Sequence, residues 1–236
     1  MNSRTGLDDG HLLRSWWFPP IRGYRSGARA THVRYDLDDQ PRLAALDDQL
    51  SWLEGEAEKP RWSIEHGEGG QQVRALTTAG LQTVVPRLPL PASLQLFARR
   101  GDLQRRIRSV TACYLDLGDF AAPVAATDGY LIHLLSDQQW CRHWLLYLDP
   151  AGQEAVITTT EPIGFHLPDD WPPPPTVVPA DGTVNLEICA DSFTEFLYRF
   201  WIENEISFAV HEGRALTQAA ASYAAQLTPR PTAPRP

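Results

Sequence analysis

The sequence has little lysine, little cysteine and no long apolar run. Lys59 is its one lysine, and the other basic residues are all arginines. The 21 lysines and arginines are outnumbered by 29 acidic residues, which gives a formal net charge of −8. Because binding to nucleic acid phosphates requires a basic face, this balance argues against nucleic acid as the main partner and favours a basic protein.

The three cysteines, Cys113, Cys141 and Cys189, are few, odd in number and far apart. They do not form the pattern of a disulfide framework, and such usage is typical of a reducing compartment. The first residues lack the apolar centre of a signal peptide, and no apolar run reaches the roughly 18 residues of a membrane span. We therefore expect a cytoplasmic protein that does not bind membranes.

Motifs of common enzyme classes are absent too. There is no glycine-rich phosphate loop, no Gly-x-Ser-x-Gly elbow, no His-Glu-x-x-His and no paired Cys-x-x-Cys. This favours a protein that is not an enzyme and that needs no cofactor. A catalytic site can still assemble from distant residues, so a metal-dependent hydrolase stays open as an alternative.

The second half of the chain has the pattern of an antiparallel sheet. Apolar, aromatic and β-branched residues fill 130–135, 140–148 and 155–160, and polar turn residues separate them. Residues 184–190 alternate between apolar and polar side chains, which is typical of a strand. The sequence therefore predicts a meander and one further strand, with a long proline-rich loop over 166–182 between them.

Helices are expected around this sheet. The strongest prediction begins at Ser192, because Glu195 completes a capping box and apolar residues form one continuous stripe. The stripe consists of Phe193, Phe196, Leu197, Phe200 and Trp201. Apolar spacing predicts shorter helices over 41–53, 92–100 and 217–227.

The remaining segments carry weaker patterns. Two short strands are predicted at 62–64 and 73–76. Residues 1–35 mix arginines, aromatics and prolines without a clear period, so no regular element is predicted there. The proline-rich end of the chain, 228–236, is expected to be a disordered tail.

The segment from His133 to His143 holds the residues with the most potential for chemistry. If residues 136–139 form a four-residue hairpin loop, strand alternation places the two histidines on opposite faces of the sheet. Only a pairing shifted by one residue would bring them together. Their spacing also matches no familiar zinc pattern. We therefore expect a structural hairpin without a metal.

Acidic and basic residues gather at three further places. Asp116 and Asp119 suit acid–base chemistry or a divalent ion, but such a pair is more typical of a solvated turn. Glu203 and Glu205 are expected near the end of the long helix, where negative charge opposes the macrodipole; a partner or a following turn would offset this, although such a pair is more typical of a simple exposed helix end. The arginines of 98–108 offer a basic patch for nucleic acid, although Asp102 and nearby carboxylates can simply pair with them.

The chain resembles the SUKH superfamily, which includes bacterial toxin-immunity proteins and the yeast cell-wall assembly regulator. The residues that carry the resemblance are "HLLSDQQWCRHWLLYLDPAGQEAV", "PIGF" and "FTEFLYRFWIENEISF". The resemblance covers about residues 90–208. It implies an α+β fold in which helices pack around a twisted antiparallel sheet, whose concave face binds proteins.

The sequence and this resemblance together predict one SUKH-like domain over 41–214, preceded by an extension over 1–40 and followed by a helix and tail over 215–236. We expect an immunity protein that neutralises a toxin by stoichiometric binding, with an interaction scaffold as the alternative. The residues expected to contact a basic toxin domain are Asp116, Asp119, Asp137, Gln138, Glu203 and Glu205. We expect no catalytic residue and no metal site, and the oligomeric state stays open.

Overall fold

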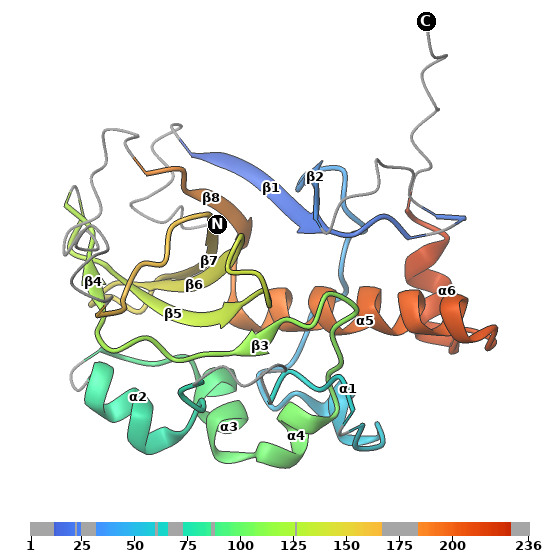
Figure 1. The fold of residues 1–236 in the computed structure, drawn as a ribbon, viewed down its shortest axis with the longest axis horizontal. Coiled ribbons are helices and arrows are strands. Elements are labelled where there is room, and N and C mark those ends of the chain that lie inside the picture. Colours follow the sequence, from blue (N-terminus) through green and yellow to red (C-terminus); the bar gives the residue numbers. More distant parts are fainter. Residues whose placement is uncertain are drawn as a thin grey trace, which may run out of the picture.

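The structure is a computed structural model, and its helices pack against an eight-stranded sheet (Figure 1). It describes residues 12–21, 23–24, 32–59, 61–65, 73–85, 88–125, 127–166 and 184–227. The predicted α+β class and the single domain are confirmed. The predicted tail, and the proline-rich loop beyond His166, lie outside the described residues.

The sheet has the strand order β2-β1-β8-β7-β6-β5-β3, and β4 also pairs with β5. The strands are β1 (Leu13–Phe18), β2 (Val33–Asp36), β3 (Tyr114–Leu115), β4 (Ala122–Pro123), β5 (Tyr130–Ser136), β6 (His143–Leu148), β7 (Glu154–Thr159) and β8 (Glu187–Ala190). The predicted meander is confirmed, since β5 to β8 pair antiparallel in chain order. The purely antiparallel sheet is wrong, because β1 runs parallel to β8.

The helices are α1 (Ser51–Glu54), α2 (Thr78–Val84), α3 (Ala92–Arg99), α4 (Gly101–Arg105), α5 (Phe193–Glu212) and α6 (Gln218–Ala224). Figure 1 shows α1 to α5 on one side of the sheet. The stripe predicted for α5 is buried in every member, so this helix anchors the main core against the sheet. None of the helices in the described segments combines the length and the apolar character that crossing a bilayer requires.

Both faces of the central strands are covered. Trp144 and Leu146 of β6 face the main core on the helical side. Leu145 and Tyr147, which alternate with them, belong to a smaller core on the opposite face. This alternation explains why β6 reads as a continuous apolar run and not as an amphipathic strand.

The N-terminal segment is part of the sheet, although no regular element is predicted for residues 1–35. Its strands β1 and β2 pair antiparallel, and Trp16 of β1 is fully buried. The expected extension over 1–40 therefore contributes two strands to the domain.

The helix predicted over 41–53 is wrong, because only the single turn of α1 forms. Leu50 has a left-handed backbone (φ 55°), which interrupts any helix before it. Asp47 then accepts hydrogen bonds from the backbone N and the hydroxyl of Ser51, at 3.1 and 3.0 Å. Such side-chain bonds to nearby backbone stabilise a turn in place of a helix.

The short strands predicted at 62–64 and 73–76 do not form either. Ser63 makes an isolated bridge with Arg108, and the preceding Trp62 has a left-handed backbone that an extended strand excludes. Residues 73–77 adopt no regular structure.

The N-terminus of α5 gives a first prediction. Ser192 accepts a hydrogen bond from the backbone N of Glu195 at 3.1 Å, as predicted, but the Glu195 carboxylate bonds the backbone N of Asp191 and not that of Ser192. Ser192→Ala is expected to lower the free energy of unfolding by about 1 kcal/mol, because one helical N–H loses its acceptor. Ser192→Thr keeps the acceptor and is the control. Equal urea midpoints for the two variants would contradict this role.

Candidate functional site

The two histidines of the hairpin lie on the same face of the sheet, and the predicted separation is wrong. A bulge in β5 changes the register, so that His133 pairs with Leu145 and Ser136 pairs with His143. The rings are 5.1 Å apart between centroids. The Ser136 hydroxyl lies 2.8 Å from Nε2 of His133 and 3.1 Å from Nδ1 of His143. This is the one-residue shift that alone could bring the histidines together.

This buried cluster cannot meet a substrate. His133, Ser136 and His143 each have no exposed surface. Burial lowers the pKa of His133 well below its usual value and that of His143 to about 4, so both rings are neutral near pH 7. Among the described residues, no group of three or more histidines, cysteines and acids is placed to hold a metal. The cluster is best understood as part of the packing between β5 and β6.

Gly118 and Gly164 lie close to each other and to His133. A Cβ at Gly118 would lie 2.8 Å from the carbonyl oxygen of Gly164 and 3.0 Å from Cβ of His133. Gly164 has φ +91°, which residues with a side chain rarely adopt. These glycines let the loop pack directly on the histidine, which has no exposed surface.

Three of the six residues expected at a partner contact are buried and serve the fold. Asp137 accepts hydrogen bonds from the backbone N of Cys141 and of Arg142, at 2.7 and 3.2 Å, and so caps the hairpin turn. Asp116 accepts one from the backbone N of Arg74 at 3.0 Å. Glu203 accepts two others inside the protein. The expected exposed acidic rim is therefore wrong for Asp116, Asp137 and Glu203.

The other three residues do not restore that rim. Asp119 is exposed next to Asp116, whose pKa is raised to about 6 by burial and, to a smaller extent, by this neighbouring charge. Gln138 is exposed on the hairpin turn. Glu205 is half-buried on α5 and is not near the helix end, because α5 continues to Glu212.

The basic patch predicted over 98–108 is neutralised within the chain. Arg100 pairs with Glu54 and Asp102, at 3.0 and 2.7 Å, and Arg105 pairs with Glu65 at 2.9 Å. Arg106 and Arg108 also bind carboxylates. The prediction that nearby carboxylates pair with these arginines is confirmed, and the patch offers little free charge to phosphates.

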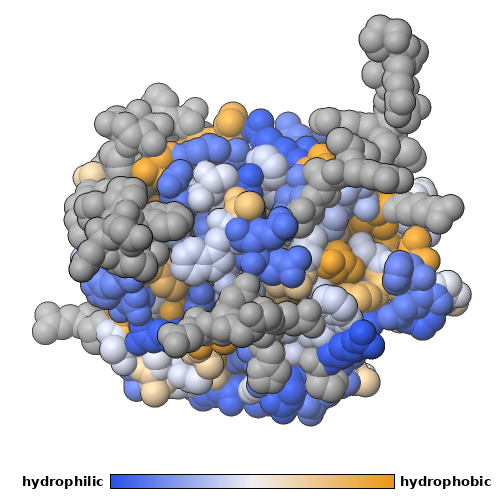
Figure 2. Space-filling model, in the orientation of Figure 1, coloured by the Kyte–Doolittle hydropathy of each residue, from blue (hydrophilic) through white to orange (hydrophobic). Residues whose placement is uncertain are grey.

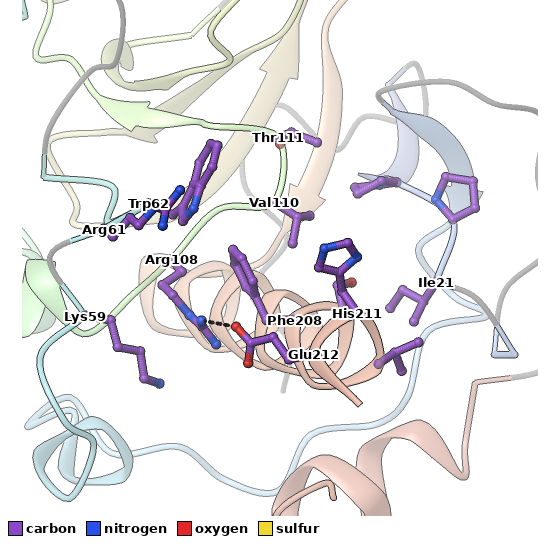
Figure 3. A pocket seen from close by; sticks show the side chains of 14 residues that line it. Ile21, Lys59, Arg61, Trp62, Arg108, Val110, Thr111, Phe208, His211 and Glu212 are labelled. Atoms are coloured by element: carbon purple, nitrogen blue, oxygen red, sulfur yellow. Dashed lines mark hydrogen bonds and ion pairs between the residues drawn. The ribbon is translucent and has the colours of Figure 1, made fainter. Parts of the chain in front are cut away.

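An open groove of about 900 Å³, which the sequence did not predict, lies on the surface of the described part of the chain. Residues from four parts of the chain form it: 19–21, 59 with 61–62, 108–111 and the C-terminal half of α5 (Figure 3). Its lining residues are Pro19, Pro20, Ile21, Lys59, Arg61, Trp62, Arg108, Val110, Thr111, Ser207, Phe208, Val210, His211 and Glu212. Figure 2 shows apolar surface on the side of this face where α5 ends, among hydrophilic residues.

Trp62 lines this groove and combines an exposed surface with a left-handed backbone. Its side chain is 37% exposed, and its backbone has φ 67°. Two backbone hydrogen bonds hold the turn: Ser109 N donates to the Trp62 carbonyl, and Ile64 N donates to the Ile107 carbonyl, both at 2.9 Å. A left-handed backbone at a bulky residue costs free energy and persists only where neighbours hold it, often at functional sites. The backbone of Trp62 is therefore held in place at the groove, with its ring partly exposed.

Arg108 and Phe208 also line the groove and contact each other. The guanidinium of Arg108 lies 3.8 Å from the ring centroid of Phe208 and pairs with Glu205 and Glu212 at 3.2 and 2.9 Å. Lys59 binds the same Glu205 at 3.0 Å. The groove thus combines aromatic rings with ion pairs that are already complete.

The sequence gives only a faint signal of this groove. A strand is predicted at 62–64, and the alternation of its residues does not predict that Trp62 is exposed. The four lining segments are far apart in the chain, so that only the fold brings them together.

Comparisons with family models, with curated proteins and with solved structures find no match to this chain. The SUKH resemblance therefore stays an expectation, and the argument about function depends on the geometry of the groove.

Proposed function

We propose that the protein is a non-enzymatic binding protein, acting in the cytoplasm, which holds a segment of a protein partner in the groove beside Trp62. The observation that carries this proposal is the exposed ring of Trp62 at an open groove of about 900 Å³, on a backbone that two hydrogen bonds hold in place. Tryptophan and arginine are the residues that most often dominate binding energy in protein interfaces. A backbone that is ordered before binding lowers the entropy cost when a partner covers the ring.

The distribution of reactive side chains supports binding over catalysis. The histidines and the serine of the hairpin are buried, so they cannot act on a substrate. In the groove, Lys59 and Arg108 are bound to carboxylates. Cys113, whose thiol lies 3.1 Å from the hydroxyl of the lining residue Thr111, is buried. Burial raises the pKa of Cys113 to about 12, which keeps it a poor nucleophile.

The particular form of binding that we propose is toxin immunity by stoichiometric occupancy. The resemblance to immunity proteins favours this form, and the net charge of −8 suits a partner of positive net charge, because opposite charges accelerate encounter. An interaction scaffold would use the same groove. The two differ in the partner, which inhibits growth in the first case only.

Trp62→Ala is expected to weaken the complex with the partner by about 30-fold, since truncating a central tryptophan typically costs about 2 kcal/mol or more. The partner is identified by capture with the wild-type protein, purified and titrated calorimetrically, and a 1:1 complex is expected. The urea midpoint of the variant should fall much less than that of a core tryptophan variant, because Trp62 is 37% exposed and lies outside the main core.

Leu13→Ala is the matched control, because Leu13 is 54% exposed but does not line the groove. Its affinity should equal that of the wild type. The reverse pattern, with Leu13→Ala weakened and Trp62→Ala unchanged, would place the interface at β1 and refute the groove. For the immunity role, wild-type protein should rescue cells that express the partner, and Trp62→Ala should rescue them less.

A further inference from the structure

We propose that the partner segment in the groove is acidic: a carboxylate binds Arg61, and an adjacent apolar or aromatic residue packs on Trp62. This inference rests on the proposed function and adds the chemistry of the bound segment. It is opposite in sign to what the net charge of the chain suggests for the partner as a whole.

The first argument is that the carboxylates around the groove are already bound. Glu212 pairs with Arg108 at 2.9 Å and also with Arg214. Glu205 pairs with Lys59 at 3.0 Å and with Arg108 at 3.2 Å. Each of these carboxylates is already neutralised by two basic side chains, so a basic segment gains less here than an acidic one.

The second argument is that Arg61 remains unused. Its side chain is exposed, and within the described segments it forms no ion pair. Its guanidinium carbon lies 5.9 Å from the centroid of the Trp62 ring. A guanidinium offers five donors in a planar fork that matches a carboxylate, and a neighbouring aromatic face shields that pair from water.

The third argument is the distribution of side chains along the groove. Figure 3 shows Lys59, Arg61 and Arg108 at one end of the pocket and Ile21 at the other. Val110 lies between these two ends, next to His211, and the prolines 19–20, which precede Ile21 in the chain, also line the groove (Figure 3). A segment that fits both ends carries its acidic residue next to Trp62 and apolar residues toward Ile21.

Local and overall charge act over different distances. The net charge of −8 governs the approach of a partner from afar, and salt screens it beyond about 8–10 Å. The contact with Arg61 forms only after the segment has entered the groove. A partner with positive net charge can therefore present an acidic segment here without contradiction.

The test is a selection of short random peptides displayed on phage, with the wild-type protein as bait and Trp62→Ala for counter-selection. We expect the enriched peptides to carry Asp or Glu beside an aromatic, proline or aliphatic residue. A synthetic peptide of the enriched sequence, labelled with fluorescein, should bind Arg61→Glu about tenfold or more weakly, in line with a charge-assisted hydrogen bond.

Two controls make the result specific. Arg99→Glu changes charge equally at an exposed arginine that ends α3 outside the groove, and it should bind the peptide like the wild type. Replacing the acidic residue of the peptide by lysine should restore binding to Arg61→Glu and weaken binding to the wild type. Urea midpoints check that each variant folds.

The outcomes separate the two proposals. Enriched peptides that depend on Trp62 but are basic or uncharged would overturn the acidic segment and leave the proposed function standing. Equal losses for Arg61→Glu and Arg99→Glu would show that net charge alone acts, which also overturns the contact with Arg61. A selection that yields no peptide dependent on Trp62 would overturn both.

Discussion

Trp16→Ala is expected to lower the free energy of unfolding by about 3–5 kcal/mol, as truncation of a buried tryptophan in a core does. Trp16 is fully buried and packs against Phe196 of α5, with ring centroids 6.0 Å apart. Its indole N–H donates to the carboxylate of Glu203 at 2.9 Å. The alanine variant therefore leaves a cavity and also removes a donor from a buried acid, which adds to the cost.

Two further variants separate these contributions. Trp16→Phe keeps an aromatic ring in the core but removes the donor to Glu203, so an intermediate loss is expected. Leu13→Ala changes an exposed residue of the same strand and should stay within about 0.5 kcal/mol of the wild type. The measurement is urea denaturation of all three. A Trp16→Ala midpoint as close to the wild type as that of Leu13→Ala would show that β1 is not held to α5.

This contact also shows why the N-terminal strands escaped the sequence analysis. Trp16 and Glu203 are 187 positions apart, and β1 pairs with β8 at similar separation. Local patterns report on elements whose partners are near in the chain. The meander β5–β6–β7 and the helix α5 were predictable because turns, alternation and a capping serine all lie within a few residues.

The candidate site was less predictable for two physical reasons. A single bulge in β5 reverses which face His133 occupies, and nothing in the residues between His133 and His143 marks that extra residue. The groove needs four segments that only the folded chain brings together. Exposure of Trp62 depends on its left-handed backbone, which is unfavourable for a bulky residue and thus contrary to its local preference.

The free energy of unfolding is expected to fall as the pH is lowered, because the protein contains buried histidines. Burial lowers the pKa of His32 and of His143 from 6.5 to about 4, with Arg142 contributing at both, and it lowers the pKa of His133 well below its usual value. Between pH 6.5 and 4 the unfolded chain therefore binds more protons at these residues than the folded protein does. Stability from these groups is complete above pH 6.5 and is lost as the pH falls, by on the order of 3 kcal/mol for each of His32 and His143.

Buried carboxylates oppose this trend. Burial raises the pKa of Asp116 from 3.8 to about 6 and also raises the pKa values of Asp137 and Glu154. Between pH 3.8 and 6 the folded protein binds more protons at Asp116 than the unfolded chain does. This carboxyl group therefore favours the folded state as the pH falls, and the observed slope of stability against pH is a difference between the two kinds of residue.

Replacing one residue of each kind separates their contributions. Urea unfolding between pH 6.5 and 4 should show that His143→Asn has a shallower acid loss than the wild type, because one proton uptake on unfolding is removed. Asp116→Asn should have a steeper loss, because the opposing group is gone. Any loss of packing is the same at each pH, and it therefore cancels when slopes are compared. If His143→Asn and Asp116→Asn change the slope in the same direction, or leave it unchanged, then these groups are not held neutral by burial as the structure indicates.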